Sequence, residues 1–215
     1  MRSLFLLGLG LVLVLAGCTA VTPPAGDEDA PRVAFYGDSY TLGTGASDPS
    51  LRWSSIICAE RGWQEFNPSV NGLGFVNNRA TDGEGDLPAL VIANDPSIVF
   101  ITMGLNDNFS YDRAANQIRL RITEDFTRLA TALPDARFIV VEPFWYTDRR
   151  PESVEVIIGW VRDAAAAIGA DYIPGASHWI EGHPEWMASD GLHPNDAGYA
   201  AMATRMDAEL TKLGL

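Results

Sequence analysis

Three residues of this chain carry the side-chain types that can activate a hydroxyl group for attack on a carbonyl carbon. Asp190 and His193 stand three positions apart, just ahead of a helical segment. At that spacing a short loop lets the carboxylate bind Nδ1 of the imidazole, which leaves Nε2 free to take a proton. Ser39 offers a hydroxyl that is a weak nucleophile at neutral pH and needs such a base. Gly37-Asp38-Ser39 alone is more typical of a turn, and the distant Asp190–His193 pair favours a nucleophile.

These residues need a scaffold that brings both ends of the chain together. Nearly continuous apolar runs, typical of strands buried on both faces, occupy residues 32–36, 98–103 and 138–142, with weaker candidates at 64–67 and 172–173. Segments with helical spacing lie at residues 49–61, 86–93, 113–133, 152–168 and 195–213. This alternation predicts a parallel sheet with helices on both faces.

In such sheets, ligands bind beyond the carboxyl ends of the strands. The first predicted strand is followed by Gly37-Asp38-Ser39-Tyr40, the third by Gly104-Leu105-Asn106-Asp107, and the fourth by Pro143-Phe144-Trp145-Tyr146. We therefore expect these polar and glycine-rich loops to meet at one edge of the sheet.

Four sequence blocks, in order, make the chain resemble the SGNH, or GDSL-like, hydrolase superfamily over residues 32–215. The first matches Gly37-Asp38-Ser39, although Tyr40 stands where leucine is common; we expect this departure to affect packing behind the serine more than chemistry. The glycine block matches Asn71-Gly72-Leu73-Gly74 less cleanly. The Gly-x-Asn-Asp block matches residues 104–107 fully, and Asp-x-x-His matches residues 190–193.

The resemblance implies a flavodoxin-like three-layer α/β/α sandwich around a parallel sheet of about five strands, with no cofactor and no metal. It also implies a catalytic triad of Ser39, Asp190 and His193. The implied oxyanion hole consists of the backbone N–H groups of Ser39 and Gly72, with Gly74 as the alternative to Gly72, and the side-chain amide of Asn106. Such donors stabilise the negative charge of a tetrahedral intermediate.

Asp38 and Asp107 flank these residues, and we expect them to brace the loops. A second carboxylate beside the nucleophile has no proton-transfer step to perform.

The predicted function is hydrolysis of carboxylic esters through an acyl-Ser39 intermediate, with a small-molecule or glycan ester as substrate. Short acyl groups such as acetyl are expected, because no apolar insertion long enough to form a lid is evident. Acyl transfer to a glycan hydroxyl remains an alternative. A non-catalytic cell-envelope binding module is a further one, although the complete set of matching residues argues against it. No Gly-x-Ser-x-Gly occurs, which argues against the α/β-hydrolase fold.

The first 17 residues predict an export signal, with Arg2 followed by an uncharged apolar run at residues 4–16. Leu15-Ala16-Gly17-Cys18 resembles the bacterial lipobox, which implies lipidation of Cys18 and a protein anchored on the outer side of the membrane. The alternative is an ordinary signal peptide and a secreted protein, with Cys18 as a small apolar residue or a disulfide partner of Cys58. If Cys18 is lipidated, Cys58 is a lone, buried thiol. Residues 18–31 predict a flexible tether, and residues 32–215 a single domain.

The remaining polar features do not predict a second site. A net charge of −13 argues against nucleic acids as partners. His178 and His183 lack the further ligands of a metal site, so we predict loop residues. Asp82, Glu84 and Asp86 alternate like a calcium loop without its other ligands, which favours a solvated turn before a helix.

The tryptophans divide into two groups by position. Trp53, Trp63 and Trp160 lie on predicted helices or their ends and are expected in the core. Trp145, Trp179 and Trp186 lie near the predicted catalytic edge. For these three, lining of an acyl or alcohol pocket and simple packing remain open.

Overall fold

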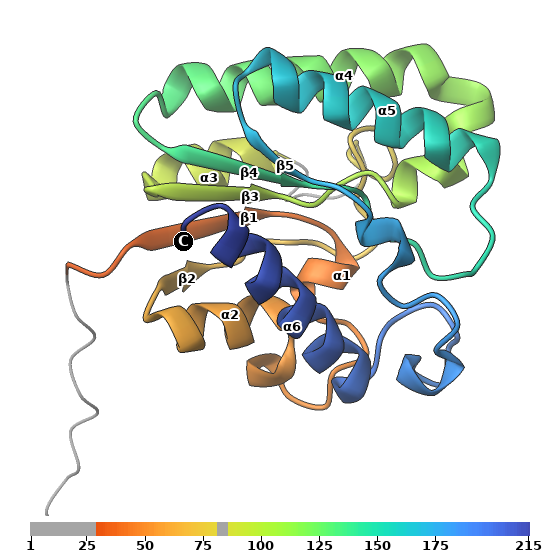
Figure 1. The fold of residues 1–215 in the computed structure, drawn as a ribbon. Coiled ribbons are helices and arrows are strands. Elements are labelled where there is room, and N and C mark those ends of the chain that lie inside the picture. The colour runs from red at the N-terminus through yellow and green to blue at the C-terminus, as the bar shows by residue number, and fades with distance from the viewer. Residues whose placement is uncertain (1–28, 81–85) are drawn as a thin grey trace, which may run out of the picture.

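Five parallel strands form the central layer of the structure, a computed structural model that describes residues 29–80 and 86–215. The sheet order is β2-β1-β3-β4-β5 (Figure 1). The chain winds outward from β1 in both directions, so the β1/β3 boundary is the switch point of a flavodoxin-like sheet. The predicted fold class is confirmed. The strands are β1 (Arg32–Tyr36), β2 (Gln64–Phe66), β3 (Ile98–Ile101), β4 (Arg137–Val141) and β5 (Asp171–Ile173).

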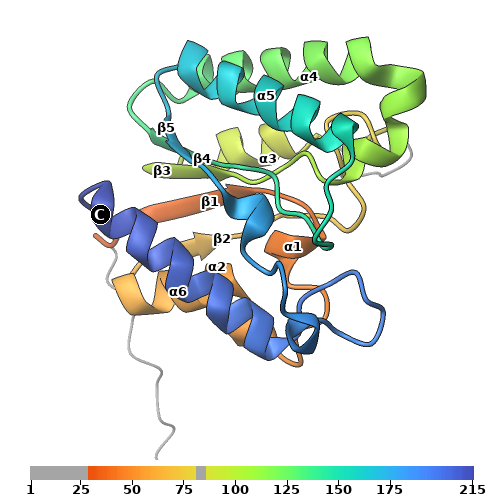
Figure 2. The same ribbon diagram turned by 45° about the vertical axis from the view of Figure 1, so that its right-hand side comes forward.

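Helices cover both faces of this sheet (Figures 1 and 2). One face carries α2 (Trp53–Arg61) and α6 (Asp196–Lys212). The opposite face carries α3 (Leu87–Asn94), α4 (Tyr111–Ala132) and α5 (Glu152–Ala167). The short α1 (Ser39–Leu42) follows β1 directly.

Alternation along the strands divides the core into two clusters. Val33 and Phe35 of β1 pack in the cluster that contains α2 and α6 residues, whereas Ala34 and Tyr36 pack with α3, α4 and α5 residues. Successive side chains of a strand point to opposite faces, so a strand buried on both sides reads as a continuous apolar run. This burial fixes the register of β1, and with it the position of the loop that follows.

Most predicted element bounds lie within two residues of the observed ones, and the exceptions have local causes. The predicted helix 49–61 is wrong as one element: a 3-10 helix, Pro49–Leu51, is followed by Arg52 with extended ψ of 149°, and α2 begins only at Trp53. The Asp48 side chain caps the first turn by accepting from Ser50 N–H at 2.8 Å. Further short helical turns were not predicted: α1, and the 3-10 helices Asn106–Ser110, Ala176–His178 and Pro184–Trp186.

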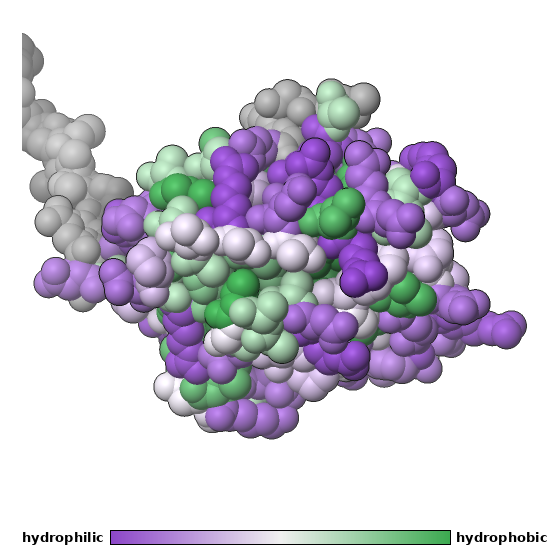
Figure 3. Space-filling model, turned by 90° about the horizontal axis from the view of Figure 1, so that it is seen from above, coloured by the Kyte–Doolittle hydropathy of each residue, from purple (hydrophilic) through white to green (hydrophobic). Residues whose placement is uncertain are grey.

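The surface over α4 and α5 is mainly hydrophilic, with hydrophobic residues in separate places (Figure 3). Leu120 of α4 is the most exposed large apolar side chain among the described residues, at 60%. No helix within residues 29–80 and 86–215 is both long and apolar enough to cross a membrane.

The structure tests several predictions that concern single residues. Cys58 is buried as a free thiol, and burial raises its pKa. Trp53 is fully buried, as expected, whereas Trp63 and Trp160 are only partly buried and pack against the two core clusters. Trp145 and Trp179 also lie in the core, with 3% and 7% exposure, which answers the open question for these two in favour of packing.

Other predictions concern segments that the structure does not describe. Cys18, the export signal and most of the tether, together with Asp82 and Glu84, lie outside the described residues. Asp86 immediately precedes α3 and caps it, because its side chain accepts from Ala89 N–H; it also pairs with Arg128, in keeping with a turn that leads into a helix.

Candidate active site

The β1–α1 junction presents Ser39 at the start of a helical turn. A side chain at Gly37 would place Cβ 2.5 Å from Thr102 Oγ1, so only glycine lets this turn pack against the end of β3. Asp38 caps α1, because its Oδ1 accepts the N–H of Tyr40 at 3.0 Å. Ser39 is the first helical residue, with 4% exposure, and its own N–H is one that a helix leaves unpaired.

His193 and Asp190 form the hydrogen-bonded pair that their spacing predicts. Asp190 Oδ2 lies 2.7 Å from His193 Nδ1. Asp190 Oδ1 accepts the backbone N–H groups of Leu192 at 2.9 Å and His193 at 3.0 Å. Hydrogen bonds from the backbone and ring of His193, then from Leu192, lower the pKa of Asp190 to about 2. An ionised carboxylate at Nδ1 selects the tautomer that leaves Nε2 as proton acceptor.

The segment that carries this pair is a narrow loop closed at its base. Met187 and Pro194 form an antiparallel bridge, and Ala188 N–H donates to His193 O at 2.8 Å. Asn195 then caps α6 by accepting from Gly198 N–H at 3.1 Å. The loop is therefore held both to itself and to the helix that follows.

Two tyrosines connect the Ser39 segment with the C-terminal part of the chain, one to this loop and one from α6. Tyr40, next to Ser39, donates its hydroxyl to Leu192 O, next to His193, at 2.7 Å. Tyr199 of α6 donates to Thr44 O at 2.8 Å. Tyr40 also stacks on Phe144 at 5.6 Å between ring centroids. Tyr40 was expected to affect packing behind the serine more than chemistry, and the bond by which its hydroxyl joins the two segments was not predicted.

The glycine block lies against Asp107. The Asp107 carboxylate accepts the N–H groups of Phe75 at 2.7 Å, Val76 at 2.8 Å and Asn77 at 3.2 Å. A side chain at Gly74 would put Cβ 2.6 Å from Asp107 Oδ2. Burial raises the pKa of Asp107 to about 6, although the three N–H groups oppose the shift. The expected bracing role of Asp107 is confirmed.

The side-chain amide of Asn106 lies between the other two segments. Asn106 Nδ2 donates to Leu73 O at 3.0 Å and, at a longer 3.3 Å, to Asp38 Oδ2. Burial raises the pKa of the Asp38 carboxyl to about 7. Ser39, the glycine block and Asn106 thus meet at the carboxyl edge of the sheet through Asp38, Leu73 and Asn106.

The two candidate glycines differ in their backbone N–H groups. Gly74 N–H donates to Asn77 O at 2.9 Å. Among the hydrogen bonds of the described residues, none uses Gly72 N–H. Gly72 has a left-handed backbone with φ of 71°, and its carbonyl accepts from Asn77 Nδ2 at 2.8 Å.

A second brace of the glycine block was missed in the sequence. Arg79 Nη2 lies 2.9 Å from Asp125 Oδ1, and Tyr36 donates its hydroxyl to Asp125 Oδ2 at 2.5 Å. Arg79 also donates to Phe75 O at 3.3 Å. The available signal was Asp125 itself, which falls on the apolar stripe of α4 beside Ile122 and is 3% exposed. A charge in that position requires a buried partner.

The other histidines were expected in loops: His183 lies in one, whereas His178 ends the 3-10 helix Ala176–His178. Each pairs with a neighbouring glutamate, which was not predicted. His178 Nδ1 lies 2.5 Å from Glu181 Oε2, and His183 Nδ1 lies 2.9 Å from Glu185 Oε1. Within the part of the chain that the structure describes, no group of three or more acidic, histidine or cysteine side chains is arranged to hold a metal.

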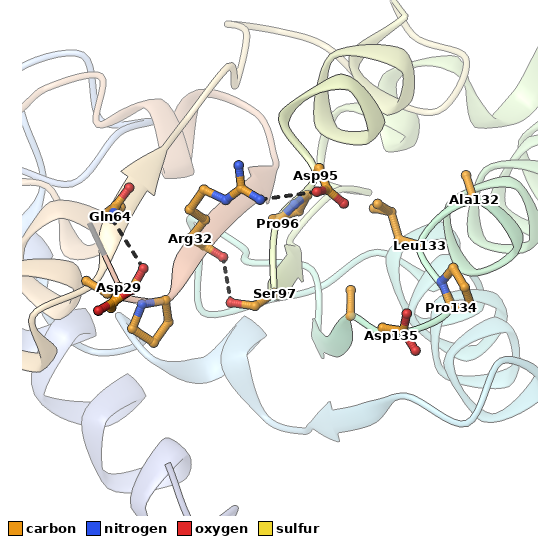
Figure 4. Close-up of a pocket in the computed structure, with 13 residues that line it drawn as sticks. Asp29, Arg32, Gln64, Asp95, Pro96, Ser97, Ala132, Leu133, Pro134 and Asp135 are labelled. Atoms are coloured by element: carbon orange, nitrogen blue, oxygen red, sulfur yellow. Dashed lines mark hydrogen bonds and ion pairs between the residues drawn. The ribbon is translucent and has the colours of Figure 1, made fainter. Parts of the chain in front are cut away.

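Two hollows lie at opposite edges of the sheet. One, of about 470 Å³, adjoins the His193 loop and is lined by residues of two segments, 146–148 and 180–191. The other, of about 1030 Å³, lies at the amino ends of the strands, where Arg32 pairs with Asp95 and accepts from Ser97 (Figure 4). Only the first adjoins the loops that the topology assigns to ligand binding.

Comparison with known proteins agrees with this fold and gives the family. Residues 35–201 match the GDSL-like lipase/acylhydrolase family, and the chain belongs to it. The chain is 28% identical to the GDSL lipase Rv0518 of Mycobacterium tuberculosis, over 92% of this chain and 90% of that protein.

Solved structures share the fold at lower identity. The crystal structure of TesA has a TM-score of 0.69 and 21% identity, covering 85% of this chain and 99% of that one. The acetylxylan esterase Axe2 of Geobacillus stearothermophilus, solved as a catalytic mutant, has a TM-score of 0.60 and 16% identity, covering 84% and 96%. The protein is an SGNH-type carboxylic ester hydrolase.

Proposed function

We propose that the protein cleaves carboxylic esters through an acyl-enzyme formed on Ser39, with His193 as the base and Asp190 as its partner. The observation that carries this proposal is the Asp190–His193 contact of 2.7 Å on a loop that Tyr40 ties to the Ser39 segment. An imidazole oriented by a carboxylate, beside a serine at a helix start, is the arrangement that activates a hydroxyl.

The reaction proceeds in two halves. Ser39 Oγ bonds to the ester carbonyl carbon while His193 Nε2 takes the hydroxyl proton, and the imidazolium then protonates the departing alkoxide as the ester C–O bond breaks. Water then attacks the acyl-Ser39 ester by the same route and releases the acid. Asp190 stays ionised throughout, because its hydrogen bonds with His193 and Leu192 lower its pKa to about 2.

Backbone and side-chain donors stabilise the tetrahedral intermediates. We assign these donors to the N–H groups of Ser39 and Gly72 and the amide of Asn106. The N–H of Gly72 makes no hydrogen bond among the described residues, whereas the N–H of Gly74 donates to Asn77 O. This difference supports Gly72 over Gly74 as the oxyanion donor. The amide hydrogen of Asn106 that makes the long 3.3 Å contact with Asp38 is the one we assign to the oxyanion.

We propose short acyl groups, such as acetyl, as the preferred substrates. Three apolar side chains beside the candidate oxyanion donors, Leu73, Phe75 and Leu105, are each at most 3% exposed. They therefore offer little apolar surface to a long acyl chain. The similarity to an acetylxylan esterase supports the same choice. Acyl transfer to a glycan hydroxyl would use the same acyl-Ser39 with a sugar in place of water.

We also propose that Cys18 is lipidated after removal of residues 1–17, and that residues 18–31 tether the domain to the outer side of the membrane. The lipobox-like Leu15-Ala16-Gly17-Cys18 supports this proposal. Stable anchoring needs more than one acyl chain, which a diacylated cysteine supplies.

A Ser39→Ala variant tests the catalytic proposal. We expect its turnover of p-nitrophenyl acetate to fall at least a thousandfold, because the bond-forming oxygen is gone. Its melting temperature should stay close to that of the wild type. Hydrolysis at a substantial fraction of the wild-type rate would show that Ser39 is not the nucleophile. In wild-type protein, faster cleavage of dodecanoyl than acetyl esters would contradict the acyl preference.

A further inference from the structure

The cavity of about 470 Å³ has one wall in common with the catalytic loop. Ala188, Ser189 and Gly191 line it, and they flank Asp190 within the loop closed by the Met187–Pro194 bridge. The facing wall comes from the segment after β4, through Tyr146 and Asp148. The cavity therefore lies at the carboxyl edge of the sheet, on the histidine side of the site.

The position of a cavity relative to the base decides which half of an ester it can hold. In the mechanism above, His193 Nε2 delivers its proton to the alcohol oxygen, so the alcohol leaves on the histidine side. The acyl oxygen turns instead toward the donors of Ser39, Gly72 and Asn106. A cavity built on the His193 loop thus fits the alcohol half and not the acyl half.

Polar groups in this cavity suit hydroxyl groups. The structure gives Asp148 one hydrogen bond, in which Oδ1 accepts from Gly182 N–H at 2.9 Å, so Oδ2 is available to a ligand. His183 is held by Glu185 at Nδ1, which leaves Nε2 for a hydrogen bond. Ser189 adds an exposed hydroxyl. Carboxylates accept hydrogen bonds from alcohols strongly and repel anions.

Apolar groups supply the remaining surface and are fixed in place. The Tyr146 ring packs on Trp145 at 4.6 Å between centroids, and Trp145 is bound in turn through Nε1 to Thr147 Oγ1 at 2.9 Å. His183 stacks on Trp186 at 3.6 Å with an interplanar angle of 9°. Ile180, Pro184 and Met187 supply the rest of this apolar lining. A preformed site with a few polar groups on an apolar surface is typical of small-ligand sites.

We propose that this cavity is the alcohol subsite of the esterase and that it binds a neutral polyhydroxylated alcohol, a sugar unit, through Asp148, His183 and the Tyr146 ring. The sugar's hydroxyls donate to the Asp148 carboxylate, and its C–H face lies on the aromatic surface. Asp148, the only acidic side chain among the described lining residues, disfavours alcohols that carry phosphate. This inference rests on the proposed acyl-Ser39 mechanism and specifies its substrate class.

The test compares esters that share one acyl group and differ only in alcohol. Methyl 6-O-acetyl-glucopyranoside, ethyl acetate and acetyl-glycerol 3-phosphate are assayed with wild type, Asp148→Ala, Asp148→Asn and Tyr146→Leu. In wild type, kcat/KM should be highest for the acetyl sugar. The ratio of kcat/KM for the acetyl sugar to that for ethyl acetate should fall about tenfold or more in Asp148→Ala, mainly through KM. Asp163→Ala, an exposed carboxylate on α5, is the matched control and should leave this ratio unchanged.

A second arm uses the acyl-enzyme directly. Methyl glucopyranoside is added to a p-nitrophenyl acetate reaction, where it should react with the acyl-Ser39 in place of water and form acetyl sugar. The rate of this transfer should saturate as the sugar concentration rises. With ethanol at equal hydroxyl concentration, the rate of transfer should not saturate. The Asp148→Asn variant keeps an acceptor for Gly182 N–H and should weaken this interception without unfolding the loop.

The outcomes separate this inference from the proposed function. Unchanged alcohol ratios in all three cavity variants, or preference for the glycerol phosphate ester, would overturn the sugar subsite while Ser39-dependent hydrolysis stands. Activity that persists in Ser39→Ala would overturn the mechanism first, and the subsite with it.

Discussion

Asp38 places an ionisable group inside the candidate site, between the nucleophile and Asn106. It is 1% exposed, and burial raises its pKa to about 7 from an ordinary value near 4. The sequence shows a carboxylate here and led us to expect that it braces the turn, but its pKa depends on its burial, which only the assembled fold reveals.

This raised pKa makes folding stability depend on pH. Between about pH 4 and pH 7 the folded protein holds a proton on Asp38 that the unfolded chain has released, so the free energy of unfolding falls as pH rises. An Asp38→Asn variant lacks this contribution, whereas the raised pKa of Asp107 acts in both proteins. Chemical denaturation at each pH should show wild type losing up to about 4 kcal/mol relative to the variant across this range. A difference that does not change with pH would contradict the shift at Asp38.

A substitution at Asn106 distinguishes an electrostatic role of this residue in catalysis from a purely structural one. Asn106→Ala removes a donor to the developing oxyanion, so kcat should fall about a hundred- to a thousandfold with a much smaller change in KM. The lost hydrogen bond to Leu73 O should lower stability by about 0.5–1.5 kcal/mol. Steady-state kinetics and denaturation of the same variant provide the check. An unchanged kcat would remove Asn106 from the oxyanion hole and leave Ser39 and Gly72 to form it.

Among the elements, the loop that carries Asp190 and His193 shows how far sequence reasoning extends. The contact between these two residues follows from a spacing of three and was predicted. The attachment of the loop to the nucleophile segment by the Tyr40 hydroxyl was not, because it joins residues 152 positions apart. The same limit applies to Asp125. The sequence shows that this charge falls on an apolar helix face, but only the fold shows that its partners are Tyr36 and Arg79.

The Tyr40 contact predicts that Tyr40→Phe affects catalysis more than its stability cost suggests. Loss of the bond to Leu192 O should cost about 0.5–1.5 kcal/mol of stability and, by loosening the His193 loop, lower kcat about threefold to tenfold. Tyr199→Phe is the matched control, since it loses a similar bond to Thr44 O but one that does not reach the His193 loop. Thermal melts and kcat for both variants measure the two effects. Equal kcat losses would show that the Tyr40 hydroxyl has no special role in placing His193.

At the scale of the whole molecule, strand and helix positions were predictable because both cores depend on simple periodicity. The nearly continuous apolar runs of β1, β3 and β4 reflect burial on two faces, and the helices show apolar stripes. The short 3-10 helices were missed, because a single turn is too short to show a helical period. Only Pro49–Leu51, among the 3-10 helices of the described residues, has a side-chain cap, which Asp48 supplies.

The proposed anchor gives a prediction for the intact protein. In a bacterial host, wild type should fractionate with membranes, and Cys18→Ser should be released or remain unprocessed. Cys58→Ser is the matched control, because its buried thiol lies in the core and has no part in attachment. Mass spectrometry that finds an unmodified Cys18 at the mature N-terminus would reject lipidation.

The account as a whole depends on one covalent bond, between Ser39 Oγ and the acyl carbon. A p-nitrophenyl alkylphosphonate imitates the tetrahedral intermediate and transfers its phosphonyl group to an activated serine with release of p-nitrophenol. Peptide mapping of the inactivated protein should locate one phosphonyl group on Ser39, with far slower labelling in His193→Ala, because the base is absent. A label on another residue, or full inactivation without a label on Ser39, would contradict the central claim.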